Sequence, residues 1–222
     1  MANLPNIEYT KIKKNPTIES PTSAFELPFY KDEEYLSVID NFVQFVKAVE
    51  RLVRLSDDYK RYKSYLMGEI GLTYCQVLSN IEEEFANIEM HHGPVFTLFD
   101  YACILTDWML AKNKKITTFN VAELLLEEHF KHRIQVVMLS ETIHEQVHAG
   151  NIFINLNQAF GDLNGFVEKY RDGFNLVMAK KLNYYIQRSI TSGASFDNGV
   201  LQLNAFVSSW KQNYDFEENK ED

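Results

Sequence analysis

The chain has 222 residues, of which 45% are apolar and 14% aromatic, so it can bury a sizeable core. Its formal net charge is −9, which argues against a general electrostatic attraction to nucleic acid. The two cysteines, Cys75 and Cys103, form no CxxC pair that would predict a zinc ribbon. Because the sequence has neither an 18-residue apolar run nor a signal-peptide pattern, we expect a soluble, cytoplasmic protein with no membrane partner.

The first part of the chain predicts an arm followed by helices. Residues 1–30 hold four of the five prolines and predict an extended arm. Apolar residues at spacings of three and four then predict a helix from residue 33 to residue 53. Ser56 predicts the N-cap of a second helix over 57–80, with a weak point at its middle glycines. We therefore expect an N-terminal helical region over 31–84.

Two short runs in the centre of the chain have the character of β-strands. Residues 86–92 alternate in polarity and stop at Gly-Pro, and residues 133–139 are rich in β-branched side chains. A helix that opens at Ser140 or Glu141 and ends at Gly150 follows the second run. The remaining helices are expected over 98–112, 121–131, 164–170 and 173–190.

These elements predict an α+β chain that is mostly helical. A strand–insertion–strand–helix unit occupies 85–155 and contains a long helical insertion over about 95–133. This unit is embedded between the N-terminal helical region and a C-terminal helical region over 156–214, and an acidic tail follows over 215–222. The apolar insertion is expected to build its own core layer or a surface for a partner.

All six histidines fall in this central unit, and four of them form its two motifs. His91 and His92 end the first strand, before Gly-Pro, while His144 and His148 share one face of the following helix. Two imidazoles on one helix face can chelate a metal ion, and His91 would complete a three-nitrogen site with open positions. His92 remains for acid–base chemistry, because an unperturbed histidine pKa of about 6.5 suits neutral pH. This set of groups is suited to hydrolysis of a phosphodiester.

The two motifs together resemble those of the HNH endonuclease family. Glu-Met-His-His-Gly-Pro at 89–94 looks like the end of the first strand of that family. Thr-Ile-His-Glu-Gln-Val-His-Ala-Gly at 142–150 looks like its metal-binding helix. Gln135 stands nine residues before His144, where the family has an asparagine, and the insertion is longer than the usual loop. The all-histidine set is closest to that of the nuclease colicins.

The resemblance implies a ββα-metal finger with assigned roles for its residues. His91, His144 and His148 would be the metal ligands, and His92 would be the general base. The ion would be divalent, with Mg²⁺, Mn²⁺, Zn²⁺ and Ni²⁺ all left open. The motifs also resemble HNH-like proteins carried by bacteriophages, which would place the protein in the host cytoplasm. Gln135 would brace the loop of the base. From their positions alone, Glu89 on the strand face of His91 and Glu145 beside His144 are further supporting residues, with a solvated surface glutamate as the alternative for Glu145.

The sequence therefore predicts a metal-dependent DNA endonuclease or nickase. The alternative is a weak or inactive HNH-like phage protein that binds a host or virion protein, through the insertion or the N-terminal arm. A small-molecule metallohydrolase has little support, and the oligomeric state stays open. The basic residues expected to bind DNA are Lys47, Arg51, Arg54, Lys60, Arg61, Lys180 and Lys181.

Overall fold

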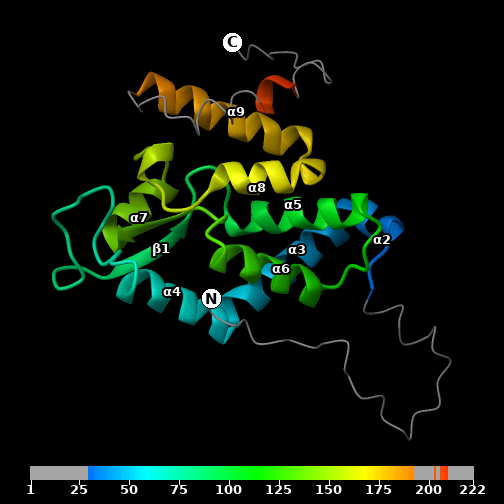
Figure 1. Cartoon of the computed structure of the whole chain (residues 1–222), viewed down its shortest axis with the longest axis horizontal. Helices are drawn as coiled ribbons and strands as arrows, with labels where there is room; N and C mark the ends of the chain where they lie inside the picture. The colour runs from blue at the N-terminus through cyan, green and yellow to red at the C-terminus, as the bar shows by residue number, and fades with distance from the viewer. Residues whose placement is uncertain (1–29, 193–202, 204–205, 210–222) are drawn as a thin grey trace, which may run out of the picture.

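The computed structural model describes residues 30–192, 203 and 206–209 (Figure 1), so nearly all of the predicted arm and the whole predicted tail lie outside the described residues. The prediction of a mostly helical α+β chain is confirmed. The helices are α2 (Glu33–Ser37), α3 (Ile39–Leu55), α4 (Asp57–Gly68), α5 (Leu98–Ala111), α6 (Thr118–Phe130), α7 (Glu141–His148), α8 (Leu163–Lys169) and α9 (Leu176–Thr191). The strands are β1 (Ile88–His92) and β2 (Val136–Ser140).

Polar caps set the starts of several helices where the sequence predicts them. The Ser56 side chain accepts a hydrogen bond from the Tyr59 N–H at 3.1 Å and begins α4, as predicted. At α5, Thr97 and Asp100 form a reciprocal capping box. Ser140 is the residue before α7, although its side chain makes no capping bond.

The predicted continuation of α4 to residue 80 is wrong. The helix ends at Gly68, and residues 69–87 form a long irregular connection that includes Gly71 at a φ of +82°. Cys75 in this connection is buried in a small apolar cluster beneath the sheet, together with Ile88 and Met138. Its apolar residues therefore belong to the packing of the sheet, which a helical periodicity in the sequence does not reveal.

The insertion between the strands is the centre of the main core. Helices α5 and α6 pack against each other and against α3, and Figure 1 shows α5, α3 and α6 running side by side. Nine of the fourteen residues of α5 are buried, because apolar residues occur around most of the helix. The insertion thus builds a core layer, as one of the two predictions for it expects. In the part of the chain that the structure describes, no helix has both the length and the apolar character needed to cross a membrane.

The two strands form an antiparallel pair in which Ile88 faces Ser140 and His92 faces Val136. The other edge of β2 is covered by separate segments. The Gln76 main-chain N–H donates to the Met138 carbonyl at 2.8 Å, and the Met138 N–H donates to the Gln76 side chain at 2.7 Å. Val136 exchanges two main-chain hydrogen bonds of 2.9 Å with Phe160. All five residues of β2 are consequently buried.

The two-residue period of β1 sends His91 and His92 to opposite faces. His92 points into the core and is only 5% exposed. Its Nε2 atom lies 3.0 Å from Nε2 of His129, and its ring stacks on Tyr59 with the ring centroids 5.8 Å apart. The Nδ1–H of His129 donates to the Leu125 carbonyl at 2.7 Å, so the N–H between the two rings comes from His92. Burial lowers the pKa of both imidazoles, that of His129 to about 4, so the pair is neutral at pH 7.

A buried carboxylate ties α6 to α8. Glu128 is fully buried and accepts hydrogen bonds from Lys169 at 2.7 Å and from Arg133 at 3.0 Å. Burial alone would raise the pKa of the Glu128 carboxyl, but the hydrogen bonds from Lys169 and Arg133 outweigh it and hold the pKa below its ordinary value. The carboxylate is therefore charged and forms an ion pair with each of the two cations.

Replacing Glu128 by alanine should destabilise the fold strongly. The change removes the buried counter-charge of Lys169 and Arg133 and leaves a cavity, which costs about 3–5 kcal/mol in the free energy of unfolding. The matched control is Glu127→Ala on the same helix, where the lost ion pair with Lys131 is half exposed and contributes less than about 1 kcal/mol. Chemical denaturation of both variants checks the difference, and equal losses would contradict the assignment.

The buried histidine pair should make the fold sensitive to acid. The pKa of His129 is about 4 in the folded chain and about 6.5 in the unfolded chain. Between these two pH values the imidazole is therefore protonated mainly in the unfolded chain. The stability is thus fully present above about pH 6.5 and falls as the pH drops toward 4, by up to about 3 kcal/mol for this group. Urea denaturation between about pH 7 and pH 4.5 measures the slope, which should shrink in His129→Phe. A flat profile would refute the prediction.

Candidate functional site

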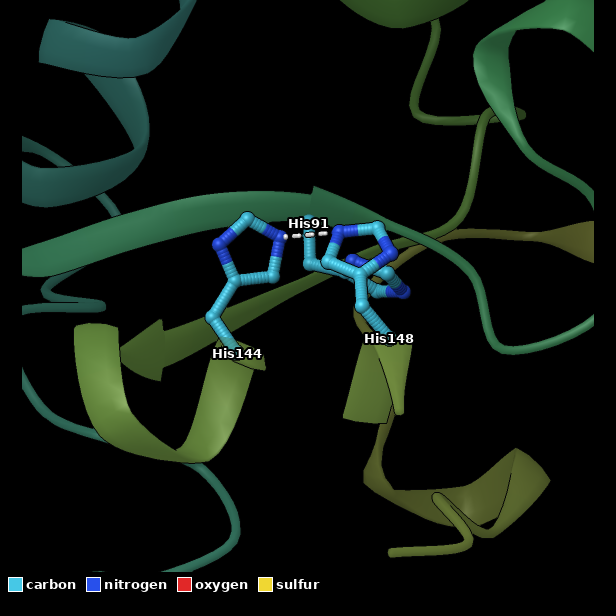
Figure 2. Close-up of side chains that lie close together, drawn as sticks. All are labelled: His91, His144 and His148. Carbon is cyan, nitrogen blue, oxygen red and sulfur yellow. Dashed lines mark hydrogen bonds between the residues drawn. The ribbon is translucent and has the colours of Figure 1, made fainter. Parts of the chain in front are cut away.

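Three histidines from separate parts of the sequence gather beside the sheet (Figure 2). His91 comes from β1, and His144 and His148 come from one face of α7, which follows β2 without a loop. One ring nitrogen of each residue lies within 4.8 Å of the others, and the Nε2 atoms of His144 and His148 are 2.9 Å apart. The prediction that the two motifs meet in space holds for these three side chains, which form the histidine cluster.

Glu89 fixes the orientation of one ring in the histidine cluster. It shares the outer face of β1 with His91, and its Oε2 atom lies 2.5 Å from Nδ1 of His144. A carboxylate at this distance accepts the Nδ1–H, which leaves Nε2 of His144 as a free acceptor toward His148. The predicted supporting role of Glu89 therefore corresponds to a contact with His144.

The His91 ring packs closely against the turn that ends β1. A Cβ atom at Gly93 would come within 3.0 Å of the His91 ring, so glycine allows the ring to lie over the main chain. Burial, followed by the neighbouring His144 and His148, lowers the pKa of His91 to about 4. The ring is therefore a neutral imidazole at pH 7, the form that can bind a metal ion.

The other two supporting residues behave differently from Glu89. Gln135 is buried, and its contacts to the turn come from the main chain: its N–H donates to Tyr101 Oη at 3.0 Å, and its carbonyl accepts from Gly93 at 3.3 Å. The Gln135 Oε1 atom has no hydrogen-bond partner among the described residues. Glu145 is exposed on α7. The sequence reasoning also missed that residues 144–148 read His-Glu-x-x-His, a spacing typical of helices that bind zinc through both histidines.

The role predicted for His92 is wrong. It lies on the face of β1 opposite to the histidine cluster, paired with His129 in the core. A general base must reach the proton that it removes, and a ring that is 5% exposed and already hydrogen bonded does not reach a substrate at the surface. Its pKa, lowered well below 6.5 by burial, also makes it a weak base.

The basic residues predicted to bind DNA do not form one surface. Most of them are committed to nearby acids: Arg54 to Glu50, Lys60 to Asp57, Arg61 to Asp58 and Lys181 to Asp100. Lys47, Arg51 and Lys180 are exposed. Helix α4, which carries Lys60 and Arg61, lies along the bottom of the molecule, and α9, which carries Lys180 and Lys181, lies along the top (Figure 1).

The sequence around the histidine cluster is acidic. Residues 64–111 and 134–168, which contain the sheet, α7 and the connection after α4, include no lysine or arginine. They carry several exposed glutamates, among them Glu82, Glu83 and Glu141. These glutamates would repel a phosphate backbone, and among the described residues the one cation whose charge acts on His91, Arg54 of α3, is paired with Glu50.

Comparison with known proteins identifies the family. The family model described as "Bacteriophage G278-like virion protein" matches residues 5–209, whereas no curated protein and no solved structure gives a significant match. The predicted bacteriophage origin is thereby confirmed. The prediction of a DNA endonuclease or nickase is wrong, since the family consists of virion proteins and the match favours the alternative of a phage protein that binds a protein partner. The chain belongs to the family of bacteriophage G278-like virion proteins.

Proposed function

We propose that this protein is a structural component of the phage particle and acts by binding another virion protein. The family match over residues 5–209 carries the proposal. A surface that suits such contacts supports it. Phe85, in the connection after α4, is 76% exposed and lines an open hollow of about 370 Å³ together with Leu78 and Ile81. Exposed aromatic side chains beside a hollow are typical of sites where proteins bind each other.

Purified particles of the phage that encodes the chain should contain it after a wash in about 0.5 M salt. Phe85→Ser should lower the amount in the particle by about tenfold or more, because a buried aromatic anchor contributes about 2 kcal/mol or more to a contact. Quantitative mass spectrometry measures this, with Leu55→Ser as control, since Leu55 is 65% exposed at the end of α3 and outside the hollow. Finding the chain only in the cytoplasm of infected cells would refute the proposal.

We further propose that β1, β2 and α7 form a ββα-metal finger like that of the HNH proteins, kept as a structural unit. The donor set supports the binding of one divalent ion. Two nitrogens on a tetrahedral Zn²⁺ at about 2.0 Å lie about 3.3 Å apart, close to the 2.9 Å between the Nε2 atoms of His144 and His148. An all-imidazole set favours Zn²⁺ or Ni²⁺ over Mg²⁺ by ligand softness. The ion would join β1 to α7.

Metal binding should depend on the histidine cluster and on Glu89. In calorimetric titrations with Zn²⁺ and Ni²⁺, His144→Ala should abolish binding, and Glu89→Gln should weaken it by about 10–100-fold through the lost hydrogen bond to His144. The control is Glu145→Gln on the same helix, where affinity should not change. Saturating metal at about 100 times its dissociation constant should raise the free energy of unfolding by about 2.7 kcal/mol. Equal affinity in wild type and His144→Ala would refute the site.

A further inference from the structure

Two exposed surfaces of this chain have complementary character. The first, the acidic hollow, is the hollow of Phe85, Leu78 and Ile81 with the exposed glutamates at 82–84 beside it and Glu141 in its wall. None of the residues that line it is basic. The hollow thus offers apolar area inside a rim of negative charge.

The second surface is a stripe along α9. Val177 and Tyr184 are 69% and 52% exposed, and they lie seven residues apart, which places them on one helix face two turns from each other. The exposed cations Lys180 and Arg188 lie on the same face. Arg188 stacks on Phe153, with its guanidinium carbon 4.3 Å from the ring centroid, and donates to Tyr184 Oη at 2.5 Å. We name these four α9 residues the basic stripe.

The charges of the two surfaces are opposite because acidic and basic residues are separated along the chain. Residues 173–196 contain no aspartate or glutamate, whereas residues 64–111 contain no lysine or arginine. Lys180 has no ion-pair partner in the part of the chain that the structure describes. Helix α9 runs along the top of the molecule and the connection after α4 lies at its left side, so one copy presents the two surfaces in different directions (Figure 1).

We propose that the acidic hollow binds the basic stripe of a second copy of this chain. The match is one of a helix lying in a groove, with Val177 and Tyr184 entering the apolar floor and Lys180 and Arg188 meeting the glutamates. Because each copy uses two different surfaces, the contact is head-to-tail and builds a ring or a filament. It rests on the proposed function, and it names the partner as another copy of the same virion protein.

A charge-exchange experiment on the full chain tests the pairing. Wild type should associate as its concentration rises, and about 0.5 M salt should weaken the association. Glu82→Lys/Glu83→Lys/Glu84→Lys and Lys180→Glu/Arg188→Glu should each remain monomeric alone, since like charges then face each other. An equimolar mixture of the two should associate again, because each hollow then meets a stripe of opposite charge. Analytical ultracentrifugation measures all four samples.

Further variants separate the pairing from loss of folding. Val177→Glu/Lys180→Glu leaves the stacked Arg188 in place and should also restore association when mixed with the lysine variant, with thermal denaturation showing each variant folded. Phe85→Ser should weaken self-association about tenfold or more, whereas Leu55→Ser should not.

Several results would overturn the proposal. Wild type that stays monomeric at every concentration, or a mixture of charge variants that does not associate, would exclude the pairing. Association that appears only after removal of residues 215–222 would mean that the acidic tail of the chain occupies the stripe. A monomeric chain that still enters the particle in a manner dependent on Phe85 would overturn the self-pairing and leave the proposed virion function standing.

Discussion

The alternation of side chains along β1 is the constraint on which the site depends. Five residues of strand place Glu89 and His91 on the outer face and His92 on the inner face, and the antiparallel pairing with β2 holds this arrangement. A shift of register by one residue would bring His92 to the histidine cluster and bury His91. The register of the two-stranded sheet thus decides which of the two adjacent histidines joins the histidine cluster and which one is buried.

Much of the fold could be predicted from local patterns. The amphipathic spacing of α3, the cap at Ser56 and the alternation of β1 are properties of neighbouring residues, and each appears in the structure close to where the sequence predicts it. The end of α4 could not be predicted in this way. The apolar residues after Gly68 serve the cluster beneath the sheet, and this partner is distant in sequence.

The candidate site likewise contains one part that local patterns predict and one part that depends on tertiary contacts. The meeting of His91, His144 and His148 could be predicted, because helix spacing and strand order place them together. The pairing of His92 with His129 could not, since it joins β1 to α6 through a tertiary contact between residues that carry no shared motif. The resemblance implied function from the types and spacing of the histidines, and a set of metal-binding histidines is common to structural and catalytic fingers. The base and the phosphate-binding cations distinguish the two classes, and here the first is buried and the second are mostly paired with acids.

The closed edge of β2 has a consequence for assembly. Many structural proteins join by adding a strand of one copy to the sheet of another, which needs a row of unpaired main-chain groups. In this chain the side chain of Gln76 and the main chain of Phe160 already occupy that row opposite β1. Sheet extension across subunits is therefore closed at this edge of β2, and a contact with another subunit there must be made by side chains. Contacts of that kind can be reversed by salt and by single charges, so the particle could control them during assembly.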